Sequence, residues 1–255
     1  MRIKLVAIAA VMTLVGGAAQ AATVVTVAGS ANPYLAGQPS GASCCGGDTA
    51  PGQSPAQVAG VLIGGSTLTF SGTGGFSFGG GAPSDSLDGD HSGQTLTYGF
   101  SMPADYGTGI SGPQNVNVDG LVGVFLTALQ PSGPAPASIA YTAGGNSGGL
   151  ADPSFSPGLN QIFWIGDGLT GTGTGAVQQF IVPTGATRLF LGTIDGGGWF
   201  NNSGVASVTV NGLGATPSPG AVPEPATWAM LILGFLGLGA AMRSRRRTGA
   251  AALAA

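Results

Sequence analysis

Several oxygen donors lie in one loop, where Asp195, Asn201 and Asn202 flank three glycines and the aromatic pair Trp199 and Phe200. Calcium in proteins is bound by carboxylate, carboxamide and main-chain oxygens, the donors that this loop supplies. A calcium ion there could take two sugar hydroxyls as ligands while Trp199 or Phe200 stacks on the sugar ring. The loop therefore predicts calcium and carbohydrate binding. The alternative is a wide hairpin in which Trp199 covers a sheet edge.

The same residues support a resemblance. Asp195 followed by Asn201-Asn202-Ser203-Gly204, just before a final strand, resembles the calcium-dependent galactose-binding lectins of bacteria, which are small β-sandwich domains. The resemblance implies that Asp195, Asn201 and Asn202 bind calcium and touch a galactoside-type glycan. It also makes the carbonyl of Tyr34 a candidate calcium ligand and Asp119 a candidate sugar contact.

The chain has two cysteines, Cys44 and Cys45, and they are adjacent. In an oxidising compartment they predict either a disulfide ring within one chain or a cross-link between two chains. A structural zinc site is excluded because it requires four nitrogen or sulfur ligands and the chain has one histidine, His91. A further acidic turn, Asp85 to His91, is compatible with either a cation or a plain surface hairpin.

Catalytic chemistry is disfavoured, and we predict that the protein is not an enzyme. A Ser-His-Asp triad would have to use His91, the one histidine of the chain. Residues 23–212 contain neither Glu nor Lys, so few groups remain to act as general acids or bases.

The charge of this part of the chain limits its partners. Between residues 22 and 221 the only basic residue is Arg188, and the acids are nine Asp, so one positive and nine negative charges give a formal charge of minus eight. Such a surface repels phosphate backbones, and nucleic acid is excluded as a partner.

The same region has the composition of a β-protein. The chain contains 49 glycines, and Gly and Asp disfavour helix interiors. Short apolar runs bounded by Gly, Pro, Asn and Asp predict an all-β domain, a β-sandwich or jelly roll, over residues 23–212. The predicted strands are 23–28, 67–70, 76–78, 95–100, 121–129, 161–165, 177–182, 188–194 and 205–211. Between them, residues 131–157 are predicted to form a long loop around a weak strand at 138–141, and residues 170–175 a flexible turn.

Residues 1–22 have the pattern of a secretory signal peptide. Arg2 and Lys4 precede an apolar run at 5–17, and Ala19-Gln20-Ala21 is a cleavage pattern. We therefore expect the domain at 23–212 to be exported into an oxidising compartment.

The end of the chain has the pattern of a membrane anchor. After a Pro- and Gly-rich linker at 213–221, Pro223, Glu224 and Pro225 precede an apolar run from 226 to 242. Four arginines follow, at positions 243, 245, 246 and 247. An apolar run closed by cations predicts a single transmembrane helix with a cytoplasmic tail at 248–255.

Residues 222–247 resemble the PEP-CTERM sorting tail of Gram-negative bacteria, in the variant with Trp228-Ala229 after the motif. The resemblance implies export, transient anchoring in the inner membrane and cleavage near Pro223-Glu224-Pro225 by an exosortase-type transpeptidase. It also implies a final place at the cell surface or in the exopolysaccharide of a biofilm matrix.

Together these patterns predict an exported, exosortase-sorted surface protein with a lectin-like domain that binds calcium and carbohydrate. A structural matrix protein without a ligand is the main alternative. An ice-binding module is a second one, since Thr67-Leu68-Thr69 and Thr95-Leu96-Thr97 carry regularly spaced threonines.

Overall fold

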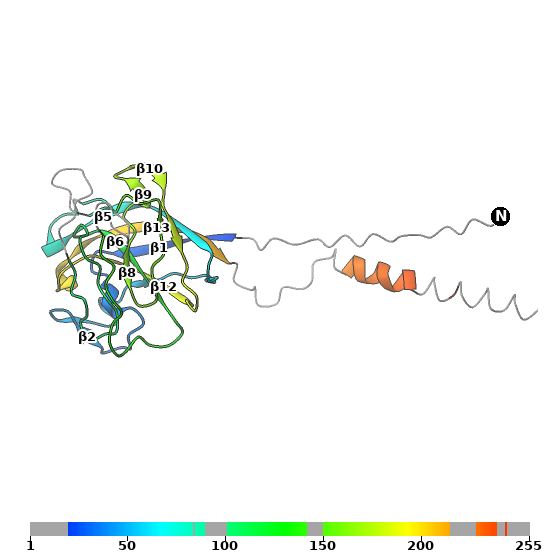
Figure 1. Cartoon of the computed structure of the whole chain (residues 1–255), viewed down its shortest axis with the longest axis horizontal. Helices are drawn as coiled ribbons and strands as arrows, with labels where there is room; N and C mark the ends of the chain where they lie inside the picture. The colour runs from blue at the N-terminus through cyan, green and yellow to red at the C-terminus, as the bar shows by residue number, and fades with distance from the viewer. Residues whose placement is uncertain are drawn as a thin grey trace, which may run out of the picture. The chain divides into compact units, whose positions relative to one another are not determined.

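A computed structural model describes residues 20–83, 85–89, 101–141, 150–214, 228–238 and 243 of the chain. The internal contacts divide the chain into two units, Met1–Ala215 and Thr216–Ala255. The first unit contains every β-strand that the described residues form, and the second contains an α-helical segment (Figure 1).

The first unit is built of β-strands and three short 3₁₀ turns, labelled η1 to η3. The strands are β1 Gln20–Ala28, β2 Ser43–Cys44, β3 Asp48–Thr49, β4 Ala56–Gln57, β5 Thr67–Ser77, β6 Leu121–Leu126, β7 Ser154–Phe155, β8 Ile162–Trp164, β9 Leu169–Gly171, β10 Thr174–Val177, β11 Gln179–Ile181, β12 Arg188–Thr193 and β13 Ser203–Gly214. The turns are η1 Pro33–Leu35, η2 Phe78–Gly80 and η3 Trp199–Asn201. The prediction of an all-β fold is confirmed, and the assignment to the jelly-roll class stays a prediction.

Two sheets make up most of the unit. The first has five strands in the order β1-β13-β5-β11-β7, and the second has four in the order β4-β12-β6-β8. Neighbours in both sheets are antiparallel except β11 and β7, which are parallel. Two small hairpins, β2-β3 and β9-β10, are added to this frame.

An aromatic cluster joins the two sheets. Phe163 of β8 and Phe180 of β11 belong to different sheets, and their ring centroids lie 5.7 Å apart. Phe180 also packs against Phe70 at 5.0 Å and Phe155 at 5.3 Å. Ala206, Val208 and Val210 of β13 are buried, which turns one face of that strand to the same core.

Strand β5 differs from the sequence prediction because it continues through a glycine-rich stretch that separated two predicted strands. The predicted strand 67–70 and residues 76 and 77 of the predicted strand 76–78 belong to the single strand β5, while Phe78 begins η2. Neighbouring backbone comes too close for a side chain here: a Cβ on Gly75 would lie 1.9 Å from the carbonyl oxygen of Asp85. Glycine at this position permits the close approach of two strands and does not end the strand.

Other predicted segments shift in smaller ways. The stretch predicted as a flexible turn, 170–175, forms most of the β9–β10 hairpin. The predicted strand at 121–129 ends at Leu126, and residue 140 makes a single bridge to Gln114. The predicted strand at 95–100 and with it Thr95 and Thr97 lie outside the described residues, as do the signal peptide up to residue 19 and His91.

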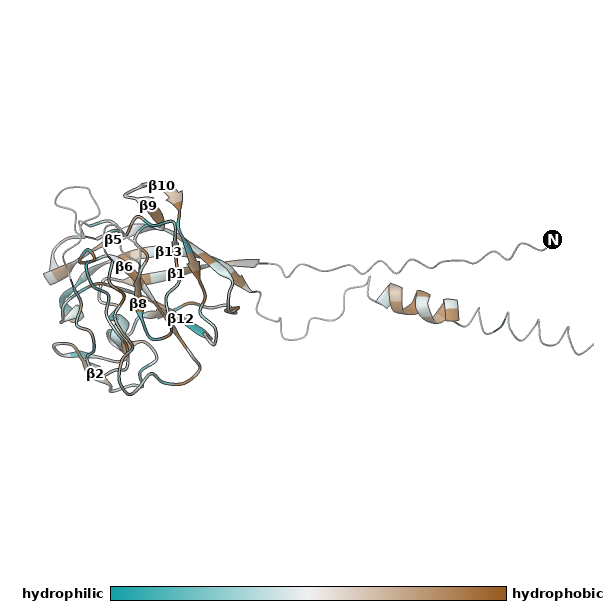
Figure 2. Ribbon diagram, viewed as in Figure 1, coloured by the Kyte–Doolittle hydropathy of each residue, from teal (hydrophilic) through white to brown (hydrophobic). Residues whose placement is uncertain are grey.

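In the second unit, residues 228–238 and residue 243 are helical. Figure 2 colours most of the 228–238 segment brown, in keeping with its Leu, Ile, Met and Phe side chains. Within the part of the chain that the structure describes, no helix has the combined length and apolar character that a membrane span requires. Pro223, Glu224 and Pro225 lie outside the described residues.

Candidate functional site

The predicted loop connects β12 to β13, so it leaves one sheet and enters the other. It begins at Asp195, forms η3 and reaches Asn202 directly before β13. The turn η2 lies beside it, because the Gly79 N–H donates to Asn202 Oδ1 at 3.3 Å. We call Asp195, Asn202, η2 and η3 together the rim.

Asp195 and Asn202 are in direct contact. Asn202 Nδ2 donates to Asp195 Oδ2 at 2.8 Å. Asp195 Oδ1 accepts the N–H groups of Gly196 and Gly197, the latter at 3.4 Å. The structure thus brings together two of the residues that the sequence predicts as calcium ligands.

The aromatic pair of the loop is divided between the surface and the core. Phe200 is 57% exposed, and Phe78 of the neighbouring η2 is 52% exposed. Trp199 is 0% exposed, and its indole Nε1 donates to the carbonyl of Thr193 at 3.0 Å. A ring without exposed surface cannot stack on a sugar, so Trp199 does not fit the predicted stacking role, and Phe200 is the exposed ring of the pair.

Asn201 and Tyr34 are not gathered around Asp195 by any contact that the structure shows. Asn201 is exposed at the end of η3, and its N–H donates to Gly198 O at 3.1 Å. Tyr34 is fully buried, and its hydroxyl donates to the carbonyl of Pro103. Its ring is edge-on to that of Trp199, with 6.1 Å between the centroids, so Tyr34 packs against η3 from the core side.

Asp119 adds a buried carboxyl group behind the rim. Its N–H donates to Ile194 O at 2.8 Å, and its Oδ2 accepts the Phe78 N–H at 2.8 Å. Burial raises the pKa of Asp119 from 3.8 to about 7; the hydrogen bond from Phe78 lowers it, and the Asp85 carboxyl and the charge of Asp195 raise it further. Negative charge therefore accumulates beside the rim as Asp119 loses its proton.

This pKa predicts a pH-dependent stability. Because the folded-state pKa lies above the ordinary 3.8, the folded protein binds the proton more tightly, and stability falls as pH rises from 3.8 through about 7. Asparagine keeps the shape and the acceptor for Phe78 but cannot ionise. We expect Asp119→Asn to raise the free energy of unfolding at pH 8 by about 1–2 kcal/mol, with little effect at pH 4. Thermal unfolding between pH 4 and 8 measures this, with Asp152→Asn as control; parallel wild-type and Asp119→Asn profiles would contradict it.

The acidic turn at 85–91 does not gather its carboxylates around one point in its described part. Asp85 is paired through its backbone with Phe76 and approaches Asp119 through its side chain. The Asp88 carboxylate is turned to another loop, where Oδ1 accepts the N–H of Asp167 at 2.9 Å.

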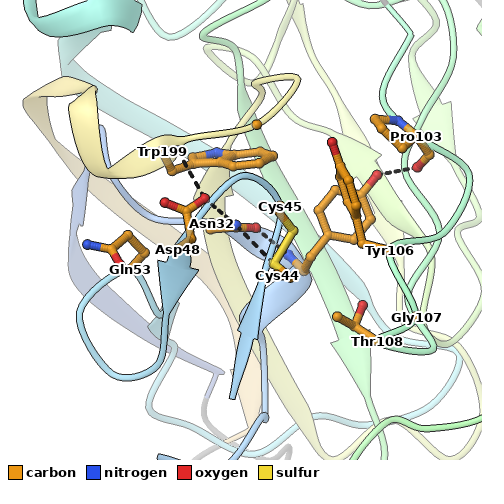
Figure 3. The surroundings of a disulfide bond; sticks show 12 residues. Asn32, Cys44, Cys45, Asp48, Gln53, Pro103, Tyr106, Gly107, Thr108 and Trp199 are labelled. Atoms are coloured by element: carbon orange, nitrogen blue, oxygen red, sulfur yellow. Dashed lines mark hydrogen bonds between the residues drawn. A yellow bond between two sulfur atoms is a disulfide. The ribbon is translucent and has the colours of Figure 1, made fainter. Parts of the chain in front are cut away.

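Asp48 binds the backbone of η3 from the core side, a role that the sequence did not predict. It is fully buried; Oδ1 accepts the Phe200 N–H at 2.8 Å, and Oδ2 accepts the N–H of Trp199 and Nδ2 of Asn32, both at 3.0 Å (Figure 3). No local pattern reveals this role, because the two backbone partners lie 151 and 152 residues later in the chain.

The cysteines next to Asp48 form a disulfide within the chain. The Cys44–Cys45 bond closes a ring, so of the two pairings that the sequence left open the structure contains the intrachain one (Figure 3). The Cys45 carbonyl accepts the Gly198 N–H at 2.7 Å. The ring therefore contacts the turn that carries Phe200.

Comparison with known protein families identifies a sorting motif in the tail of the chain. Residues 221–247 match the PEP-CTERM protein-sorting motif. The chain is therefore an exosortase-sorted, exported protein with a membrane-anchored precursor. No curated protein and no solved structure matches the chain, so the sorting motif is the relationship that these comparisons establish.

The donors of the rim limit the kind of metal it could hold. Across the described ranges, no three His, Cys, Asp or Glu side chains form a group that could hold a metal ion. A cation at the rim would depend on one or two carboxylates supplemented by carboxamide and main-chain oxygens. Calcium accepts that mixture, whereas zinc in proteins prefers nitrogen and sulfur.

Proposed function

We propose that this exported protein acts at the cell surface or in the extracellular matrix and binds carbohydrate, with calcium, at the rim. The observation that carries the proposal is the contact between Asp195 and Asn202 in the space between two turns that each present an exposed phenylalanine. Polar groups that fix hydroxyls, next to an aromatic ring that stacks on the apolar face of a sugar, are the usual components of such sites.

The charge of the domain supports a cation as partner. Arg188 is its only basic residue, and the guanidinium donates to the carbonyls of Thr127 at 2.8 Å and Leu129 at 2.6 Å. The Arg188 guanidinium therefore does not neutralise the charges of Asp195 and the partly ionised Asp119. Bound calcium would supply that positive charge and would bind sugar hydroxyls.

The residues that would hold calcium are Asp195, Asn202 and Asn201. The Asn202 nitrogen faces Asp195 and its oxygen faces Gly79, so calcium binding requires this amide to turn. Asn201 is exposed and free of the core, so its carboxamide is accessible from solvent. Phe200 would contribute contact area to the sugar and none to the cation.

Calorimetric titration of the full chain with calcium and then with galactosides tests the proposal. We expect Asp195→Ala to remove calcium-dependent sugar binding, and Phe200→Ala to weaken sugar binding on the order of tenfold, about 1.4 kcal/mol, while calcium binding persists. Asp152→Ala, which removes an aspartate distant in sequence from the rim, is the matched control.

The structural alternative gives a different result. The mutual hydrogen bond of Asp195 and Asn202 also suits a loop that only closes the fold. If the wild-type protein shows neither a calcium-dependent shift in melting temperature nor heat on addition of sugar, the rim is a structural connection and the protein a ligand-free matrix component.

A further inference from the structure

Three successive backbone N–H groups at the start of η3, from Gly198 to Phe200, are bound by one short segment, residues 44–48. The Gly198 N–H donates to the Cys45 carbonyl at 2.7 Å, the Trp199 N–H to Asp48 Oδ2 at 3.0 Å and the Phe200 N–H to Asp48 Oδ1 at 2.8 Å. These are the N–H groups at the start of η3, which a short turn cannot satisfy by itself. The position of Phe200 thus depends on a segment that is remote in sequence.

The disulfide lies within this segment. Cys45 has φ +60°, a left-handed conformation that residues with a side chain adopt rarely and keep only when their surroundings impose it. The bond to Cys44 constrains the backbone here, because it ties the side chains of two neighbouring residues together. Cys44 Sγ also accepts Nδ2 of Asn32 at 3.4 Å, and the same Nδ2 donates to Asp48 at 3.0 Å. Ring, amide and carboxylate are therefore one connected unit.

This segment packs closely against the backbone of Gly197 and Gly198. A Cβ on Gly46 would lie 3.2 Å from the Gly198 nitrogen, and a Cβ on Gly197 would lie 3.2 Å from the Cys45 oxygen. Because the two backbones are in such close contact, we expect a change in one loop to shift the other.

We propose that the Cys44–Cys45 ring and Asp48 are positioning residues for the rim, and that reduction of the ring by a dithiol releases η3 and weakens ligand binding. In that reaction the Cys44–Cys45 bond breaks, each sulfur gains a proton, and the dithiol is oxidised to its own disulfide. Cys45 then returns to the favoured backbone conformations, and its carbonyl leaves Gly198. Cys44 is partly exposed, which gives a small dithiol access to the ring.

Hydrogen exchange of the full chain, with and without dithiothreitol, tests the proposal without any ligand. We expect the amides of residues 198–200 to exchange at least about tenfold faster after reduction, with exchange in β1 and β13 unchanged. Alkylation of the freed thiols verifies that the ring has opened. The double variant Cys44→Ser/Cys45→Ser is the matched control: its residues 198–200 exchange fast from the outset and do not respond to dithiothreitol.

Equal protection of residues 198–200 in oxidised wild type and in the double serine variant would overturn the proposal. Its ligand readout depends on the proposed function: galactoside affinity in calcium should fall on reduction by about as much as loop protection does. If oxidised wild type binds no sugar, the proposed function fails, and the exchange measurement still decides the role of the ring.

Discussion

Asp48→Ala lowers the free energy of unfolding by about 3–5 kcal/mol, the largest loss of stability that we expect from a single substitution near the rim. The carboxylate is fully buried and accepts three hydrogen bonds, from Asn32, Trp199 and Phe200. Alanine leaves the N–H groups of Trp199 and Phe200 without an acceptor and leaves Asn32 Nδ2 only its contact with Cys44 Sγ. An unsatisfied buried donor costs about 1–3 kcal/mol. Thermal unfolding followed by circular dichroism measures the change.

A graded series separates the loss of hydrogen bonds from the loss of volume. Asp48→Asn keeps the size of the side chain and one oxygen acceptor, so it should fall between alanine and wild type. Asp105→Ala removes an exposed carboxylate that accepts the N–H groups of Gly107 and Ala135, and it should cost less than about 1 kcal/mol. If the free energy of unfolding of Asp48→Ala lies within about 1 kcal/mol of the wild-type value, Asp48 does not hold the rim in place.

The fold class could be predicted from the sequence because its signals are local. The alternation of apolar and small polar residues in 205–211 is visible in the sequence, and β13 extends over Ser203–Gly214. The glycines of β5 led to a wrong prediction. In the sequence they indicate a break between two strands, whereas in the structure they leave space for a neighbouring backbone. Local patterns cannot distinguish these two uses of glycine, since the second depends on Asp85, a residue of another segment.

The local contacts of the candidate site could also be predicted from the sequence, and its long-range contacts could not. Asp195 and Asn202 are close in sequence and share one loop, so their contact follows from the local pattern. The burial of Trp199 did not, because it is fixed by Asp48 and Tyr34, both far away in sequence. The same holds for Asp119, whose raised pKa arises from burial and from the Asp85 and Asp195 carboxylates that the fold brings near it.

Replacing Glu224 and Pro225 by alanine should abolish processing of the precursor, the largest functional effect that we expect. Both residues lie in the sorting motif at 221–247, and the resemblance to sorting tails places cleavage next to them. The altered chain should keep its tail and stay in the inner-membrane fraction, because the apolar run and the four arginines after it are intact. Fractionation and immunoblotting of cells that carry the exosortase measure the effect.

Folding of the exported domain can be excluded as the cause of that effect. The sorting motif belongs to the unit Thr216–Ala255, and every strand that the described residues form belongs to the unit Met1–Ala215. The domain should therefore melt at the wild-type temperature in the Glu224→Ala/Pro225→Ala protein. A second variant, Arg245→Ala/Arg246→Ala, keeps Pro223-Glu224-Pro225 but reduces the positive charge after the apolar run, and it should reduce membrane retention without removing the cleavage motif. Unchanged processing of the Glu224→Ala/Pro225→Ala chain would show that the motif does not direct sorting.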